Sequence, residues 1–162
     1  MNQVVNLFWT IVCFIPIITY WSVTGQLLWC FIFLGISVLS QVLPFSRLQL
    51  SSQPKFYERL GVKFIRKFVQ HGEYINKFHQ KRQPHYRIVK DKVSAARYLK
   101  TIMMYERFHF MCFVFFLLTA IHALINWHYS LFIIIIIANV IYNVYPMLLQ
   151  QYNRARIARF IK

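Results

Sequence analysis

The sequence predicts an all-α polytopic membrane protein, in which two transmembrane helical hairpins (four spans) are joined by a basic, amphipathic-helical cytoplasmic segment. Apolar segments at about 4–21, 27–43, 108–125 and 131–149 each approach the roughly 20 residues that a spanning helix needs. Charged residues make up only 14% of the 162 residues, against about a quarter in a soluble domain. The 19 Lys and Arg outnumber the 4 Asp and Glu and flank the apolar segments. We therefore expect a single membrane domain, 1–162, and no nucleic-acid partner.

The apolar segments are expected to pair through short turns. The first segment has no Lys or Arg before it and no small-residue cleavage site after it, so we expect a retained span and not a signal peptide. "SVTGQ" joins the first two segments and "NWHYS" joins the last two. Neither connection leaves room for a further domain.

The basic residues predict the orientation in the membrane. Neither turn contains Lys or Arg, whereas the region from Arg47 to Arg107 contains 15 of the 19, together with all four acidic residues. The positive-inside rule then places this region and both termini in the cytoplasm, with the protein in a bacterial plasma (inner) membrane. The same basic surface is expected to face anionic lipid head groups.

The connecting segment, 45–107, is expected to be helical at the membrane surface. Phe56, Leu60, Phe64 and Phe68 recur every four residues with basic residues between them, a pattern typical of an interfacial amphipathic helix. Pro84 should interrupt the helix. A further helix should begin near a cap at Asp91 and continue into the third apolar segment.

A carboxylate and an imidazole lie three residues apart where the third apolar segment begins. Helical spacing puts Glu106 and His109 on one face, and a carboxylate can orient an imidazole as a general base for an alcohol nucleophile. A structural ion pair or hydrogen-bonded pair explains the same spacing. "HGEYINK", with His71, Asn76 and Lys77, is similarly either a site or a helix break at the interface.

The fourth apolar segment carries amides and ends in a polar cluster. Asn139, Asn143 and Gln150 share one helical face, and amides within a span face other helices or a polar cavity. Interhelical hydrogen bonding is the alternative explanation. The cluster that follows combines two amides, a phenol and two guanidinium groups that can grip a phosphate: Gln151, Tyr152, Asn153, Arg154 and Arg156. A positive-inside anchor explains the arginines but not the amides. The chain has no Cys/His cluster at zinc spacing and no Gly-rich phosphate loop, so no metal is expected.

These motifs resemble the glycosyl-4,4'-diaponeurosporenoate acyltransferases, small membrane enzymes that complete the carotenoid staphyloxanthin. "HGEYINK" is similar to the family's cytoplasmic His-Gly motif, and Glu106 with His109 is similar to its Glu-x-x-His. The family's C-terminal signature, an Asn followed seven residues later by Gln-x-Tyr-Asn-Arg-x-Arg, is matched by Asn143 and "QQYNRAR". The resemblance extends from about Lys55 to Ile157.

The resemblance implies a membrane acyltransferase that moves a fatty acyl group from a thioester to a hydroxyl of a glycolipid-like or glycosylated isoprenoid or carotenoid acceptor. His109 would be the base and Glu106 would orient it. The remaining motif residues would bind the two substrates: His71, Asn76, Lys77, Asn143, Gln150, Tyr152, Asn153, Arg154 and Arg156. No cofactor is implied beyond the donor, an acyl-CoA or acyl carrier protein.

A non-enzymatic alternative fits the same pattern of spans and charges. A small membrane subunit that scaffolds an envelope or secretion complex, or that forms a homo-oligomer, would also have apolar spans and a basic face. A channel or transporter is less favoured because the spans hold few ionisable groups. An enzyme should gather its polar groups in one site, whereas a scaffold should distribute them over a surface that faces its partner.

Overall fold

The computed structural model describes residues 2–43, 48–65 and 91–161, and within these ranges the chain is helical apart from short turns and contains no strand. The elements in chain order are α1 (Asn2–Thr24), α2 (Leu27–Leu39), η1 (Ser40–Val42), α3 (Pro54–Arg59), α4 (Val62–Ile65), α6 (Lys92–Ile125), α7 (Tyr129–Asn139), η3 (Val140–Val144) and α8 (Tyr145–Ile161).

The longest helix, α6, begins at a capping box. Asp91 Oδ1 accepts a hydrogen bond of 2.7 Å from the backbone N–H of Ser94, and the backbone N–H of Asp91 donates to Ser94 Oγ at 3.0 Å. The predicted cap at Asp91 is thus confirmed, and the bond from Ser94 lowers the pKa of the Asp91 carboxyl. With 34 residues, α6 is about 50 Å long, which exceeds the ~30 Å hydrocarbon core of a bilayer.

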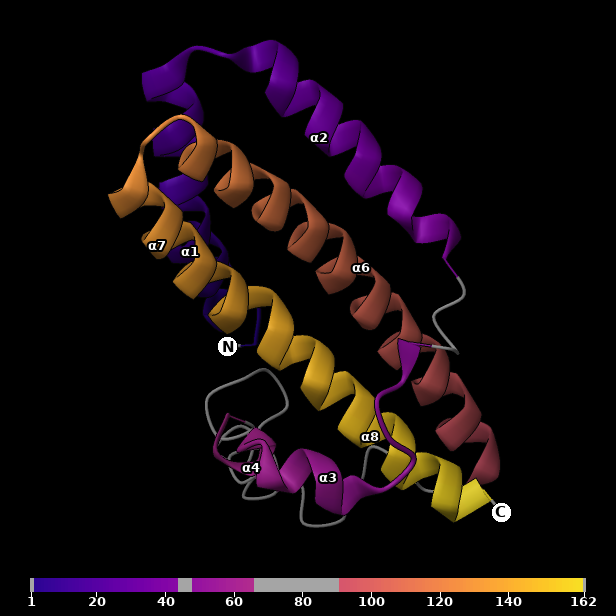
Figure 1. Cartoon of the computed structure of the whole chain (residues 1–162). Helices are drawn as coiled ribbons and strands as arrows, with labels where there is room; N and C mark the ends of the chain where they lie inside the picture. The colour runs from indigo at the N-terminus through magenta and orange to yellow at the C-terminus, as the bar shows by residue number, and fades with distance from the viewer. Residues whose placement is uncertain (1, 44–47, 66–90, 162) are drawn as a thin grey trace.

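The last three elements form one continuous rod that runs back along α6. After a turn in which Trp127 adopts a left-handed φ of 63°, α7, η3 and α8 follow one another without a break (Figure 1). Residues 140–144 form a π turn, which accommodates one more residue than a regular α turn. This antiparallel pair, α6 with α7–η3–α8, is the frame on which the other helices pack.

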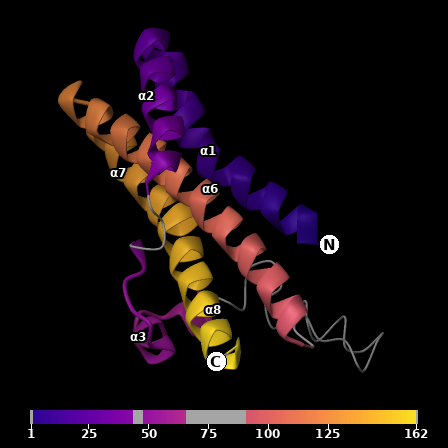
Figure 2. The ribbon, with the colours of Figure 1, turned by 90° about the vertical axis from the view of Figure 1, so that its right-hand side faces the viewer.

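The first two helices cover this frame on different sides. α1 packs on α7 and η3, whereas α2 packs on α6. Figure 2 shows that α1 diverges from α6 toward its N-terminal end. Thr10 Oγ1 and Tyr142 Oη, 2.8 Å apart, form a hydrogen bond that ties α1 to the π turn. The main apolar core lies where these helices meet and contains Cys13, Ile17, Tyr20, Trp21, Phe33, Phe115, Phe116, Ala120, Ala123, Ile135, Ala138 and Tyr142.

The amphipathic helix predicted from the recurrence of Phe56, Leu60, Phe64 and Phe68 differs from what the structure shows over its first part. Gly61, at φ +79°, separates α3 from α4, so residues 54–65 form two short helices and not one. Tyr57 and Val62 are the residues that pack against α8, while Phe56, Leu60 and Phe64 stay exposed. Periodicity alone could not reveal this, because the positive φ that Gly61 permits ends the helix. The remainder of the predicted helix, including Phe68, lies outside the described residues.

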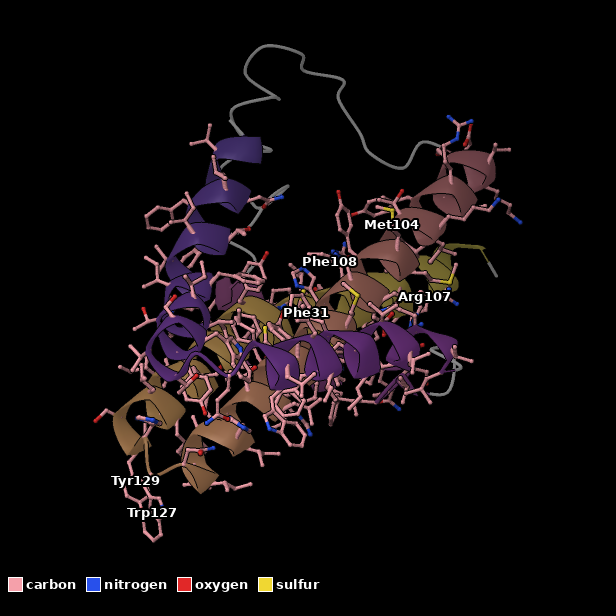
Figure 3. All side chains as sticks on the ribbon, turned by 90° about the horizontal axis from the view of Figure 1, so that it is seen from above. Phe31, Met104, Arg107, Phe108, Trp127 and Tyr129 are labelled. Atoms are coloured by element: carbon pink, nitrogen blue, oxygen red, sulfur yellow. The ribbon has the colours of Figure 1, made fainter. Side chains whose placement is uncertain are left out.

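Among the residues that the structure describes, three helical segments are long and apolar enough to cross a membrane: Asn6–Thr24, Lys92–Ile125 and Tyr129–Arg159. The second predicted span corresponds to a shorter apolar stretch, Leu27–Val42. Trp127 and Tyr129 project from the α6–α7 turn, far from Met104 and Arg107 (Figure 3). Aromatic side chains concentrated at the end of a span are typical of a membrane interface. These features indicate a membrane protein.

Candidate functional site

A buried ion pair joins α6 to α8. Glu106 on α6 is only 1% exposed. Arg154 on α8 places Nη1 3.2 Å from Glu106 Oε2 and Nη2 3.4 Å from Oε1. Burying two charges has a large desolvation cost, which an ion pair with further hydrogen bonds offsets. The side chains that surround this pair therefore determine whether both charges can remain in the seam between α6 and α8.

Gln151 supplies those further hydrogen bonds. Its Nε2 donates to Glu106 Oε1 at 2.9 Å and to the backbone carbonyl of Leu48 at 3.1 Å. Its Oε1 accepts from the backbone N–H of Leu50 and lies 3.1 Å from Tyr57 Oη. Both amide protons thus have acceptors, and Oε1 has the Leu50 N–H as a donor and a second donor when the Tyr57 hydroxyl turns its proton toward it. Burial raises the pKa of the Tyr57 phenol, so this hydroxyl remains a donor at neutral pH.

His109 lies one turn further along α6 and is not bonded to Glu106. Its ring meets the ring of Tyr142 edge-on, with 5.6 Å between centroids, and the Asn143 side chain also approaches the imidazole. His109 Nδ1 is buried and has no hydrogen-bond partner among the described residues. The carboxylate of Glu106 is turned toward Gln151 and Arg154, so the expected orienting contact from Glu106 to His109 does not form here.

Two asparagines continue the polar seam beyond His109. Asn139 Nδ2 donates to the Phe113 carbonyl at 3.2 Å, and Asn143 Nδ2 donates to Asn139 Oδ1 at 2.8 Å. The Phe113 carbonyl can only accept, so it fixes the orientation of the Asn139 amide, which in turn fixes that of Asn143. Asn143 Oδ1 is left buried without a hydrogen-bond partner within the described ranges. The seam therefore presents an unused acceptor beside His109.

The π turn at 140–144 sets the register of these side chains. Three regular turns, about 11 residues, would bring the face of Asn139 to position 150. The additional residue of the π turn moves this face on to position 151. Gln150 is consequently only half-buried and makes no hydrogen bond with a described residue, whereas Gln151 lies in the seam. Single π turns inside α-helices are frequent at functional sites.

The remaining predicted site residues are distributed over α8. Tyr152 Oη donates to Glu58 Oε1 at 3.2 Å, and the Arg156 guanidinium lies over the Tyr152 ring, 5.5 Å from its centroid. Arg156 is exposed, so it does not share a face with Arg154, whose side chain is 12% exposed. Asn153 is half-buried. His71, Asn76 and Lys77 lie outside the described residues.

Two members of this network, Gln151 and Tyr57, were assigned no role in the site from the sequence. Gln151 stands three positions before Arg154, a spacing that puts both side chains on one helical face. That spacing was a usable signal for Gln151. Tyr57 gave no such signal, because it reaches the seam from α3 through contacts with residues 94 positions away.

One of three comparisons with known proteins places the chain in a family. A family model described as glycosyl-4,4'-diaponeurosporenoate acyltransferase matches residues 41–162. This range contains α6, α8 and the residues of the seam, while α1 and α2 precede it. Neither the curated proteins nor the solved structures contain a match to the chain.

Proposed function

Because the chain belongs to the glycosyl-4,4'-diaponeurosporenoate acyltransferase family, we propose that it moves a fatty acyl group from a thioester donor to a hydroxyl of an amphiphilic acceptor. The family suggests an acyltransferase of carotenoid biosynthesis. The acceptor would be a glycosylated isoprenoid or a similar glycolipid-like molecule dissolved in the membrane. The donor would be an acyl-CoA or an acyl carrier protein, which approaches from the side where the basic residues lie.

One observation carries this proposal. Three buried atoms, His109 Nδ1 on α6, Asn143 Oδ1 on η3 and Arg154 Nε on α8, have no hydrogen-bond partner among the residues described, and the same holds for Trp21 Nε1 and Thr119 Oγ1 outside these motifs. Buried polar groups without partners are rare, and each requires an explanation such as a catalytic role or a bound ligand. All three belong to the motifs that resemble the family. Their concentration in one seam supports an enzyme over a scaffold, whose polar groups would be spread over a surface.

The proposed chemistry follows from the polar atoms that lack a hydrogen-bond partner among the described residues. Asn143 Oδ1 can only accept, so it would accept the hydrogen bond of an acceptor hydroxyl. His109 would take the proton of a second hydroxyl of the acceptor, the one that reacts, as the oxygen of that hydroxyl attacks the thioester carbonyl carbon. Arg154 Nε is a donor and would stabilise the negative charge that develops on the carbonyl oxygen. When the carbon–sulfur bond breaks, the thiolate leaves and regains a proton from His109.

Glu106 acts in this scheme through Arg154. Its carboxylate neutralises the guanidinium and holds it in the seam at 3.2 Å, so that Nε has a fixed position. A preorganised donor needs no rearrangement when charge develops, and this is the main source of electrostatic catalysis. Arg156, exposed over Tyr152, is free of the seam and would bind the phosphates of the donor. Gln150 and Asn153, both half-buried, would contact the polar head group of the acceptor.

Comparative lipidomics tests this function. Cells that produce the wild-type protein should contain an acylated amphiphile that disappears when the protein is removed. Expression of the wild-type protein should restore this product, and its mass would identify both the acyl chain and the acceptor. A lipidome that is unchanged by removal of the protein would refute the acyltransferase and leave the scaffold as the better account.

A further inference from the structure

A short segment crosses α8 before the chain enters α3, and we name it the strap (residues 48–53). Figure 1 shows this segment passing over α8 beside α6. Two of its backbone groups, the Leu48 carbonyl and the Leu50 N–H, bond to the Gln151 amide at 3.1 Å each. The side chain of Gln151 therefore attaches the backbone of the strap to α8.

Tyr57 attaches the strap at a second point. Its hydroxyl accepts from the backbone N–H of Ser51 at 2.9 Å, and its proton is directed to the Ser51 carbonyl at 2.8 Å or to Gln151 Oε1 at 3.1 Å. The Tyr57 side chain is fully buried, in a cluster with Val62 and Leu149. The strap, α3 and α8 are thus joined through the groups that surround the Gln151 amide.

The Gln151 amide can satisfy this environment in only one orientation. Rotating it by 180° would turn Oε1 toward the Leu48 carbonyl and the Glu106 carboxylate, which are all acceptors. It would also turn Nε2 toward the Leu50 N–H. The native orientation satisfies all four contacts, and one of them is to Glu106 itself. The strap backbone therefore fixes the amide, and the amide fixes Oε1 of Glu106.

We propose that Gln151 is a positioning residue that couples the strap to Glu106 and thereby holds the Glu106–Arg154 pair in its reactive geometry. This inference rests on the proposed acyl transfer. Gln151 does not touch either substrate, because all its polar atoms are occupied by protein groups. Its neighbour Gln150 lacks such bonds, so the two adjacent glutamines have different roles: Gln151 positions the Glu106–Arg154 pair, and Gln150 contacts the acceptor.

Hydrogen–deuterium exchange tests the coupling without reference to activity. Gln151→Met keeps the length of the side chain and removes all four hydrogen bonds. In the full-length protein in lipid nanodiscs, the peptide containing residues 48–53 should then exchange at least about tenfold faster, since freed amides lose their protection. Gln150→Met, one position away, should leave this exchange unchanged. Tyr57→Phe, which removes only one hydroxyl, provides a second variant and should also raise it. Equal exchange in Gln151→Met, Tyr57→Phe and Gln150→Met would overturn the coupling.

Steady-state kinetics tests the positioning role. The assay uses membranes from source cells that lack the protein, which supply the unacylated acceptor in varied amounts, with radiolabelled palmitoyl-CoA and palmitoyl-loaded acyl carrier protein as donors. Gln151→Met should lower kcat by about 10²-fold, the typical cost of a 1 Å misplacement, with little change in the acceptor KM. Gln150→Met should instead raise this KM. An unchanged kcat in Gln151→Met would overturn the positioning role. Absence of acyl transfer by the wild-type protein would refute the function, while the exchange experiment would still decide the coupling.

Discussion

At the scale of single residues, the seam depends on hydrogen-bond polarity as much as on charge. The Phe113 carbonyl orients Asn139, and Asn139 orients Asn143, so that an acceptor atom is left beside His109. At the other end of the seam, the amide of Gln151 already forms hydrogen bonds with protein groups and has none left for a ligand. The hydrogen bonds that are already formed distinguish the residues that hold the site together from those whose atoms remain available to a substrate.

The buried ion pair gives the first prediction. Glu106→Gln or Arg154→Met should each destabilise the protein by about 3–5 kcal/mol, because each leaves one buried charge without its partner. The double variant should cost much less than the sum of the two. Denaturant titration in detergent micelles would measure these free energies of unfolding.

A surface pair provides the control for this prediction. Lys63 Nζ and Glu58 Oε2 are 2.8 Å apart but exposed to solvent, so Lys63→Met should leave stability nearly unchanged. If the effects of Glu106→Gln and Arg154→Met were additive, Glu106 and Arg154 would not interact in the folded protein.

At the scale of elements, the π turn at 140–144 determines which face of α8 meets α6. It contains one residue more than a regular turn, and this residue carries Gln151 and Arg154 into the seam. Removing one residue there should convert the turn to regular α-helix and preserve the register of α8 on α6. Removing one residue from a regular part of the rod should rotate everything beyond it by about 100°.

Two single-residue deletions test this account of the rod. Deletion of Val144, inside the π turn, should yield a folded protein whose thermal midpoint is close to that of the wild type. Deletion of Ile134, an exposed residue of α7, should separate Glu106 from Arg154 and give an aggregated or strongly destabilised protein. Fluorescence-detected size-exclusion chromatography after heating would report both outcomes. Equal tolerance of the two deletions would show that the π turn does not set the register.

At the scale of the whole molecule, the basic residues within the described ranges and the exposed aromatic side chains of the α6–α7 turn lie at opposite ends of the long helices. We predict that the turn faces outward and that the strap faces the cytoplasm. In a variant without native cysteines, a membrane-impermeant thiol reagent applied to intact spheroplasts should label His128→Cys and leave Ser52→Cys unlabelled. Labelling of Ser52→Cys alone would reverse the orientation.

Long helices and their approximate pairing follow from the sequence, because apolar runs of spanning length and the short turns between them are local signals. The proximity of Glu106 to Arg154 follows from antiparallel pairing of the last two apolar segments. The sequence does not predict that Gln151 lies in the seam in place of Gln150, because a π turn leaves no mark in the spacing of apolar residues. Tyr57 and the strap reach the seam through long-range contacts, which local patterns do not encode. The break at Gly61 depends on a backbone conformation that glycine permits but does not require.

The most direct test of the central claim, that the α6–α8 seam performs acyl transfer, is the turnover of a His109→Ala variant. Purified protein in nanodiscs with the natural acceptor and an acyl donor should lose about 10²–10⁴-fold in turnover, the usual contribution of a general base. His128→Ala, at the opposite end of α6, should retain wild-type turnover, and both variants should show the wild-type elution profile. Near-normal turnover of His109→Ala, with the same folded profile, would contradict the account and place the chemistry elsewhere in the molecule.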